Sequence, residues 1–188
     1  MKNDLVEEFL ALDIESTPPP NRRPVELAIV SNTRGLIFHS YFNPGYCTQD
    51  ILAKKGLSDY LLQNASNFED RVPEIVGHIR GHHIVSWHLD FDKEFFPDKL
   101  LCAKQTHCAM KRYDPYRGVY SLKYGNYRRT KLGDAMATCG IAYMRPGPHR
   151  AFSDAQAVLD IWLWMEENPI PRFQRATNSE SKNLSLVR

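Results

Sequence analysis

The chain has 188 residues, a formal net charge of +2 and a pI of about 8.3, with 43% hydrophobic and 24% charged residues. This is the composition of an ordinary globular protein, and the small charge does not identify a polyanionic partner by itself. No apolar run is long enough to span a membrane, and the N-terminus lacks the apolar centre of a signal peptide, so we expect a cytoplasmic protein without a membrane partner.

The N-terminal part of the chain predicts three β-strands. Apolar, β-branched and aromatic residues mark these strands at 9–15, 25–31 and 35–42. The connections are short, which favours an antiparallel meander. The first connection contains three consecutive prolines, followed by Arg22 and Arg23, so we expect a stiff, basic loop.

The rest of the chain predicts alternating helices and short strands. The spacing of Ser66 and Glu69 is that of a capping box, and Thr106 is expected to cap a later helix. An amphipathic pattern near the C-terminus places Val158, Ile161, Trp162 and Met165 on one apolar face. These patterns predict helices at 48–54, 66–80, 90–95, 130–139 and 152–167, strands at 83–87 and 100–103, and a loop at 114–129.

Together, these elements predict an α/β protein whose mixed sheet is covered by helices on both faces. We find no internal repeat and no sign of a second domain. We therefore expect a single domain over residues 1–168. Residues 169–188 are polar and lack periodicity, so we expect a flexible C-terminal tail.

Two carboxylates in the first strand call for an explanation. Asp13 and Glu15 are two residues apart, so their side chains leave the same face of a strand. Two ionised carboxylates in a core repel each other and are poorly solvated, and a divalent cation such as Mg²⁺ or Mn²⁺ removes both penalties. The alternative is that both lie in solvent at a strand end, and the choice between the two depends on further carboxylates.

A second acidic segment lies at 90–95. Asp90 shares a helical face with Lys93 and Glu94, which favours a solvated charge or a cap. Asp92 shares a face with Phe95 and Phe96, which turns toward the core. Asp92 is therefore the better candidate ligand.

The third segment contains His149 and Asp154. On one continuous helix, this spacing would place the two side chains far apart around the axis. They converge only if His149 lies on the loop before the helix and Asp154 lies in its first turns, and Gly147-Pro148 supports that arrangement. A loop histidine can reach a substrate water as a general base, but alone it would be read as a surface residue.

The three segments form an ordered pattern: LDIEST at 12–17, FDKEFF at 91–96 and HRAFSDA at 149–155. Together they resemble the three motifs of the DEDDh (DnaQ-like) 3′–5′ exonuclease family. The run 25–30 is similar to the strand that follows the first motif, and 131–141 is similar to the helix before the last. The resemblance covers about 5–165. The small size and the run 101–106, together with the Lys- and Tyr-rich loop at 111–131, look most similar to the exonuclease X type.

The resemblance implies an RNase H-like fold. Its central five-stranded mixed sheet would combine an antiparallel meander with parallel strands, flanked by helices on both faces. It also implies hydrolysis of nucleic-acid 3′ ends to nucleoside 5′-monophosphates, with two Mg²⁺ or Mn²⁺ ions in the active site.

The same resemblance assigns roles by position. Ile14, Ser16 and Thr17 would line the pocket of the terminal nucleotide, and His149 would be the general base. The metal ligands would be Asp13, Glu15, Asp92 and Asp154.

The chain departs from the family pattern in two places. The family usually has Gly after a Thr-Thr type pair, where this chain has Pro18. Before Asp92 the family often has His-Asn, where this chain has Trp87 and His88. Both are candidate substrate-binding residues, although Trp87 fits a core position as well as a base-stacking one.

The segment 111–131, between the second and third motifs, interleaves basic and aromatic residues. Proteins bind single-stranded nucleic acids with this mixture, because cations contact phosphates and aromatic rings stack on bases. A solvated surface loop is the alternative reading. Arg22, Arg23, Lys123, Arg128 and Arg129 are the candidate nucleic-acid contacts. We expect sequence-independent binding, because no base-reading motif is visible.

The sequence thus favours a metal-dependent 3′–5′ exonuclease acting on DNA, with single strands preferred. A 3′–5′ exoribonuclease acting on short RNA remains open, because the motifs address phosphate chemistry and not the sugar. A non-catalytic nucleic-acid-binding protein on the same fold is the alternative from another class. The oligomeric state is open, and a homodimer is one option.

Overall fold

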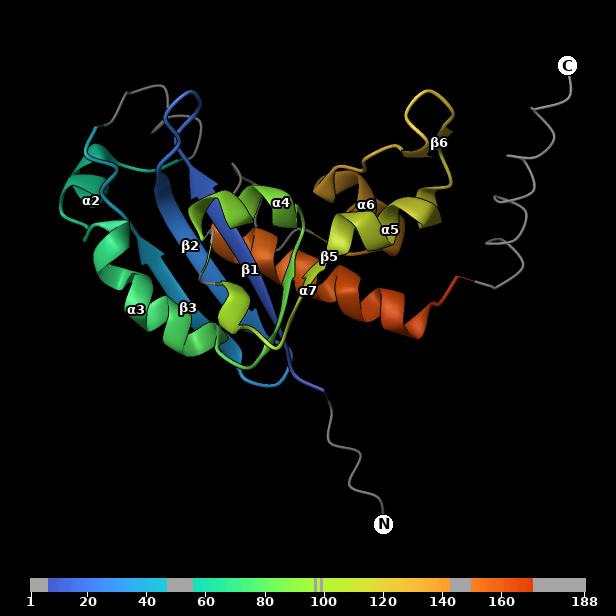
Figure 1. Ribbon diagram of the computed structural model, residues 1–188, viewed down its shortest axis with the longest axis horizontal. Helices are drawn as coiled ribbons and strands as arrows, with labels where there is room; N and C mark the ends of the chain where they lie inside the picture. Colours follow the sequence, from blue (N-terminus) through green and yellow to red (C-terminus); the bar gives the residue numbers. More distant parts are fainter. Residues whose placement is uncertain (1–6, 47–55, 97, 99, 143–149, 171–188) are drawn as a thin grey trace, which may run out of the picture.

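A computed structural model describes residues 7–46, 56–96, 98, 100–142 and 150–170. Its centre is a five-stranded mixed sheet with the order β3-β2-β1-β4-β5 (Figure 1). β1 pairs antiparallel with β2 and parallel with β4, so the predicted meander and parallel strands are both confirmed. The strands of this sheet are β1 (Phe9–Ser16), β2 (Pro24–Ser31), β3 (Gly35–Tyr41), β4 (His83–Ser86) and β5 (Gln105–Cys108).

Helices cover both faces of the sheet. α3 packs on one face and α7 on the other, each with its own cluster of buried apolar side chains. The helices are α2 (Asp59–Gln63), α3 (Phe68–Ile79), α4 (Leu89–Asp92), α5 (Ala109–Arg117), α6 (Leu132–Cys139) and α7 (Ala151–Glu167), with 3₁₀ turns η1 (Lys93–Phe95) and η2 (Leu100–Cys102). Within the described ranges, no helix is long and apolar enough to cross a membrane.

The alternation of side chains along β1 determines where its carboxylates lie. Leu10, Leu12 and Ile14 point to the α3 face and belong to its apolar cluster. Ala11 belongs to the cluster on the α7 face. Because alternate residues share a face, Asp13 and Glu15 also lie on the α7 side of the sheet.

Small side chains allow α7 to approach the sheet closely. Ala11 and Ala28 on the strands, and Ala151 and Ala155 in the first turns of α7, are all fully buried. With only methyl groups at this contact, the start of the helix lies directly over β1 and β2. The predicted apolar face of this helix is confirmed, since Val158, Ile161, Trp162 and Met165 are buried.

The predicted strand at 100–103 is wrong. Leu100–Cys102 forms a 3₁₀ turn, and the strand is the next segment, Gln105–Cys108, which pairs in parallel with β4. A short apolar run does not distinguish a strand from a helical turn, and β5 is a half-exposed edge strand without an apolar pattern. Thr106 therefore lies in β5 and does not cap a helix, since α5 begins after Cys108.

Two further local predictions need correction. α3 starts after Asn67 rather than Ser66, and no side chain caps it, so the capping-box spacing is not used. Residues 114–129 are not simply a loop. α5 continues to Arg117 and ends at Gly118 with a φ of 70°, and a small hairpin, β6 (Tyr120–Ser121) and β7 (Asn126–Tyr127), follows.

Several predictions fall outside the described residues. These are the helix at 48–54, the loop at 144–148 together with His149, and the tail beyond residue 170. The helices predicted at 90–95 and 130–139 are present, as α4 continued by η1 and as α6.

Candidate active site

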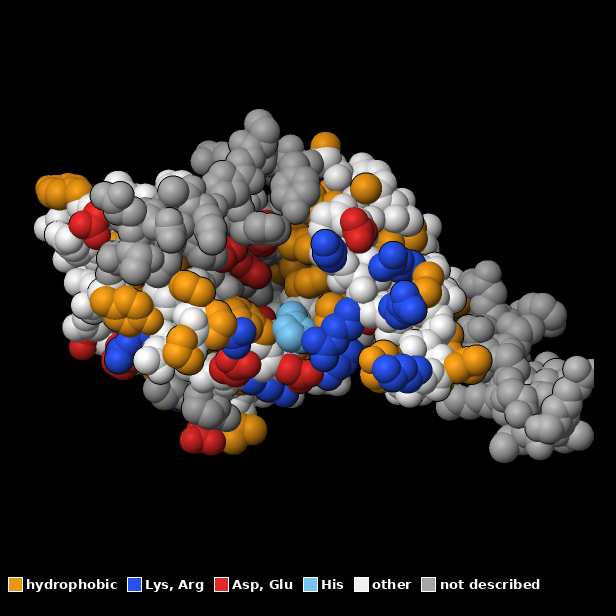
Figure 2. Space-filling model, turned by 90° about the horizontal axis from the view of Figure 1, so that it is seen from above, with side chains coloured by type: hydrophobic (Ala, Val, Ile, Leu, Met, Phe, Trp, Pro, Cys, Tyr) orange, Lys and Arg blue, Asp and Glu red, His pale blue; other side chains and the backbone are white. Residues whose placement is uncertain are grey.

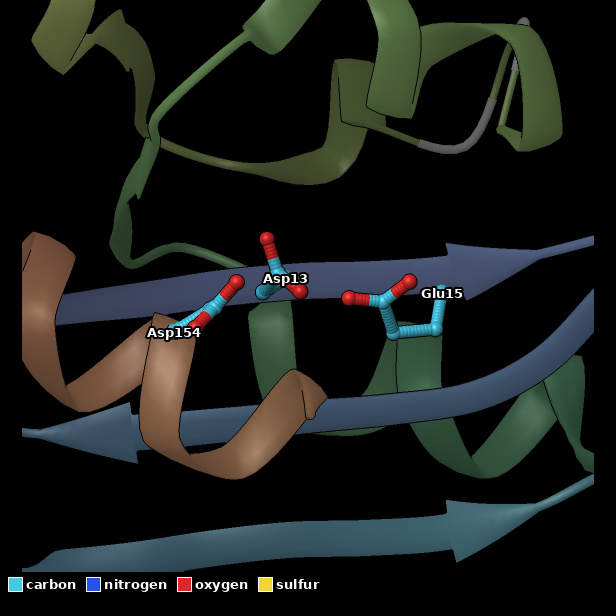
Figure 3. Close-up of side chains that lie close together, drawn as sticks. All are labelled: Asp13, Glu15 and Asp154. Atoms are coloured by element: carbon cyan, nitrogen blue, oxygen red, sulfur yellow. The ribbon is translucent and has the colours of Figure 1, made fainter. Parts of the chain in front are cut away.

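Three carboxylates from two distant segments converge at the start of α7. Asp13 and Glu15 project from β1, and Asp154 projects from the first turns of α7 into the same space (Figure 3). One oxygen from each of the three side chains lies within 4.8 Å of the others. The structure therefore brings together three of the four carboxylates that the sequence predicts to be close in space.

This donor set suits a hard divalent cation. Carboxylate oxygens are the ligands that Mg²⁺ and Mn²⁺ prefer, and three negative charges this close repel one another without a cation. Asp154 is buried and Asp13 and Glu15 are half-buried, so water solvates them only in part. The three residues fit a metal site.

Asp92 lies beside this cluster. It is 3% exposed, and one of its carboxylate oxygens accepts a hydrogen bond from the Ser86 hydroxyl. Burial, together with the charge of Glu15, raises the pKa of Asp92 to about 7 despite the hydrogen bond from Ser86. A cation at the cluster would lower this pKa, because it favours the ionised carboxylate.

A cavity of about 620 Å³ joins these acidic residues to the rest of the site. Asp13, Asp92 and Asp154 form one side of its lining, and Arg129 and Lys131 lie on the segment before α6. Figure 2 shows the hollow from above, with acidic side chains inside it and Lys and Arg side chains gathered on the side of α5 and α6. The hollow therefore offers both ligands for a cation and cations for an anionic substrate.

A family model for exonucleases, RNase_T, matches residues 10–162, which include all three carboxylates and Asp92. The chain belongs to this exonuclease family.

Solved exonuclease structures share its fold. The nuclease domain of 3′hExo, described as a DEDDh family member bound to rAMP, has a TM-score of 0.68 at 16% identity and covers 88% of this chain and 94% of its own. A 3′-exonuclease recognising a histone mRNA stem-loop gives 0.67 at 15% identity, with 87% and 83% covered. Exonuclease X with 5′ overhanging duplex DNA gives 0.55 at 15%, with 88% and 96% covered. No curated protein sequence matches the chain.

Three of the residues predicted to bind substrate line the cavity: Ile14, Trp87 and His88. Trp87 is 8% exposed and packs 6.0 Å from the Tyr113 ring, so it serves the core and also forms part of the wall. Burial, and then the charge of Arg129, lowers the pKa of His88, which favours its neutral imidazole.

Ser16 and Thr17 of the exonuclease lie beyond the cavity lining. The Thr17 hydroxyl donates to the carbonyl of Asn21 and accepts from the backbone N–H of Arg23. Thr17 thus closes the proline-rich loop at its base. Hydrogen bonds across its base therefore hold this loop, which has Pro18 where the family usually has glycine.

The two arginines of this loop occupy different positions. Arg22 forms an ion pair with Glu94 at 3.0 Å, and its guanidinium lies 5.2 Å from the centre of the Phe91 ring. Phe91 itself lines the active-site cavity. Arg23 lines a second cavity of about 650 Å³ together with Arg22 and Tyr46.

The remaining predicted cations follow α5. Lys123 lies in the β6–β7 turn, with its Nζ 5.2 Å from the Tyr124 ring. The backbone N–H of Arg128 donates to the carbonyl of Val119, and Arg129 lines the cavity. His149 lies outside the described residues, so its distance from the carboxylates stays a prediction.

An ion pair between Arg150 and Glu26, which the sequence did not predict, supports the site. Glu26 on β2 is 1% exposed and accepts hydrogen bonds from Arg150, at the start of α7, and from His39. An acidic residue inside the apolar run 25–30 was the available signal, because a buried carboxylate requires a partner. Its partner is 124 residues away, and no local pattern identifies it.

Proposed function

We propose that the protein is a metal-dependent 3′–5′ exonuclease. It would hydrolyse phosphodiester bonds from the 3′ end of DNA, with single strands preferred, and release nucleoside 5′-monophosphates. Its catalytic unit would be a single domain over residues 1–168. The observation that carries the proposal is the cluster of Asp13, Glu15 and Asp154. Two of its members, Asp13 and Asp154, line one cavity with Asp92.

The residues supply a consistent division of labour. Asp13, Glu15, Asp92 and Asp154 would hold two Mg²⁺ or Mn²⁺ ions. When bound, such ions lower the pKa of water and stabilise the leaving oxygen of a phosphodiester. We assign the shared ligand to Asp13, which lies in the cluster and lines the cavity with Asp92 and Asp154.

The proton of the attacking water requires an acceptor. We assign this role to His149, which precedes α7 and lies five residues before Asp154 in the sequence. An imidazole with an unperturbed pKa of ~6.5 accepts a proton near neutral pH. We assign to His88, which lines the cavity, a hydrogen bond to the nucleotide.

Binding would orient the 3′ end before hydrolysis. Ile14, Trp87 and His88 would contact the terminal nucleotide, with Ser16 and Thr17 shaping the neighbouring loop. The phosphates would be attracted by arginines and lysines of the proline-rich loop, of the β6–β7 hairpin and of the segment before α6, a contact that is independent of sequence and weakens with salt. These cations are Arg22, Arg23, Lys123, Arg128 and Arg129.

The proposal is tested with 5′-labelled DNA and RNA single strands of matched sequence, each with Mg²⁺ or with EDTA. We expect stepwise shortening from the 3′ end of DNA with Mg²⁺ and none with EDTA. The solved structures of this fold include one with rAMP and one with duplex DNA, so RNA is the second candidate substrate. Faster shortening of RNA would favour the exoribonuclease, and binding without shortening would favour a non-catalytic protein.

A further inference from the structure

The β6–β7 hairpin exposes apolar side chains at its tip. Leu122 is 76% exposed and Tyr124 is 68% exposed, and Val119 just before the hairpin is 39% exposed. Three of the eight large hydrophobic residues that are exposed in the described part of the chain thus fall within six positions. Such clustering indicates a contact surface, whereas single exposed apolar residues need no explanation.

The hairpin holds these side chains in a defined geometry. The backbone N–H groups of Tyr124 and Gly125 both donate to the carbonyl of Ser121, at 3.2 and 2.9 Å. Gly125 has a φ of 64°, which closes the turn at no steric cost. At the base, the rings of Tyr120 and Tyr127 meet edge to face at 5.3 Å. A preformed turn loses little conformational entropy when it binds a ligand.

The hairpin is anchored to the wall of the active-site cavity. The backbone N–H of Arg128 donates to the carbonyl of Val119 at 2.8 Å, and the next residue, Arg129, lines the cavity. The buried N–H of Thr130 then donates to a carboxylate oxygen of Asp114 at 2.8 Å, which ties the segment back to α5. The base of the hairpin is therefore joined to the cavity wall by a short, hydrogen-bonded segment.

The charge around the tip favours a polyanion. Residues 111–131 contain seven Lys and Arg and one acidic residue, Asp114, which is buried. Lys123 and Arg128 form no ion pair within the part of the chain that the structure describes. Figure 2 shows blue side chains on this side of the hollow with apolar side chains beside them, and Figure 1 shows the hairpin projecting from the α5 and α6 part of the molecule.

We propose that the hairpin tip is a second nucleic-acid site, which binds the substrate strand 5′ to the nucleotide held at the carboxylates. Tyr124 and Leu122 pack against bases, and Lys123 and Arg128 contact the phosphates between them. This inference rests on the proposed exonuclease function and adds the length of strand that the enzyme recognises. Because base stacking on an aromatic residue is tolerant of sequence, the site requires length and not a particular base.

The test compares the kcat/KM of a hairpin-tip variant on a long and on a short substrate. Leu122→Ser/Tyr124→Ser removes the exposed apolar tip, and Tyr60→Ser/Leu101→Ser is a matched control, since those residues are 79% and 82% exposed elsewhere on the surface. The substrates are a 12-nucleotide single strand and the p-nitrophenyl ester of thymidine 5′-monophosphate, which is too small to reach the tip. We expect the tip variant to lose about tenfold or more in kcat/KM on the 12-mer. On the ester it should match the wild type, and the control variant should match the wild type on both.

Equal activity of tip variant and wild type on the 12-mer would overturn the inference, as would an equal loss on both substrates. A shift of the tip variant from dimer to monomer with unchanged 12-mer binding would also overturn it, in favour of a second copy of the chain as the occupant. If the wild type hydrolyses neither substrate, the proposed function fails by itself. Fluorescence anisotropy of a labelled 12-mer in EDTA then decides the site: weaker binding by the tip variant supports it, and equal binding overturns it.

Discussion

Arg150 and Glu26 form an ion pair that fastens the start of α7 to the middle of the sheet. The Arg150 Nε lies 2.9 Å from one carboxylate oxygen of Glu26, and its Nη2 lies 3.2 Å from the other. The guanidinium also donates to the Tyr41 hydroxyl. The backbone N–H of Asp154 donates to the carbonyl of Arg150 at 3.0 Å. Because this pair fixes the first turn of the helix, it also fixes the direction of the Asp154 carboxylate toward β1.

Removing this ion pair should destabilise the protein and slow hydrolysis. Arg150→Ala leaves the buried Glu26 with His39 as its remaining side-chain partner. We expect a loss of about 2–3 kcal/mol in the free energy of unfolding, less than the ~3–5 kcal/mol of a fully buried pair because Arg150 is partly exposed. Urea unfolding of the wild type and of Arg150→Ala measures this loss.

Arg34→Ala is the control for that experiment, because it removes an exposed arginine that pairs with Glu8 at 2.6 Å. Exposed pairs of this kind contribute about 0–1 kcal/mol. If Arg150→Ala cost no more than Arg34→Ala, the pair would not hold α7 in place.

The pair also makes stability depend on acid pH. Burial opposes ionisation of Glu26, but the hydrogen bonds from His39 and Arg150 outweigh it, so the pKa of Glu26 is lowered. The unfolded carboxyl has a pKa of ~4.3, so the stability from Glu26 is fully present above that pH and is lost as the pH falls toward the lower folded pKa. We expect the difference in unfolding free energy between the wild type and Glu26→Gln to shrink from pH 6 to pH 3. A difference that is constant or larger at pH 3 would show that Glu26 is not ionised in the fold.

The carboxylate cluster should be needed for activity and costly for stability. Asp13→Ala and Asp154→Ala should each lower hydrolysis by more than ~100-fold, the upper range for mutating an outer partner of a metal ligand. Without metal, both variants should melt at an equal or higher temperature than the wild type, because one repelling charge is gone. The control is Asp160→Ala on the same helix, where the carboxylate accepts a hydrogen bond from Gln156. Full activity of Asp13→Ala with Mg²⁺ would remove this residue from the site.

His149→Ala separates catalysis from binding. A general base contributes typically ~10²–10⁴-fold to the rate, so kcat should fall by about that factor. The dissociation constant for a labelled single strand, measured in EDTA, should change much less, because the base contacts the water and not the strand. Parallel losses in kcat and in affinity would indicate that His149 holds the substrate instead.

The sequence was sufficient for the strands β1 to β4 and for the faces on which their neighbouring carboxylates lie. The period of two along β1 places Asp13 and Glu15 on one face, and the helical phase of 90–95 separates Asp90 from Asp92. Asp92 is buried, while Asp90 is exposed and pairs with Lys111 at 2.7 Å. Local periodicity is enough in such cases, because the face that a side chain occupies depends on its own element.

Features that depend on distant contacts were not predictable in this way. β5 carries polar, half-exposed residues and becomes a strand only because β4 offers it a parallel partner. The hairpin at 120–127 depends on the pairing of Tyr120 with Tyr127, within a segment whose composition is typical of a loop. The Arg150–Glu26 contact joins two segments that only the packing of α7 brings together.

The most direct test of the account is a calorimetric titration of Mn²⁺ into the wild type and into Asp13→Ala at pH 7. We expect saturable binding to the wild type that Asp13→Ala loses and the Asp160→Ala control keeps. Equal Mn²⁺ binding by the wild type and Asp13→Ala, or no binding by either with or without a single-stranded oligonucleotide, would contradict it.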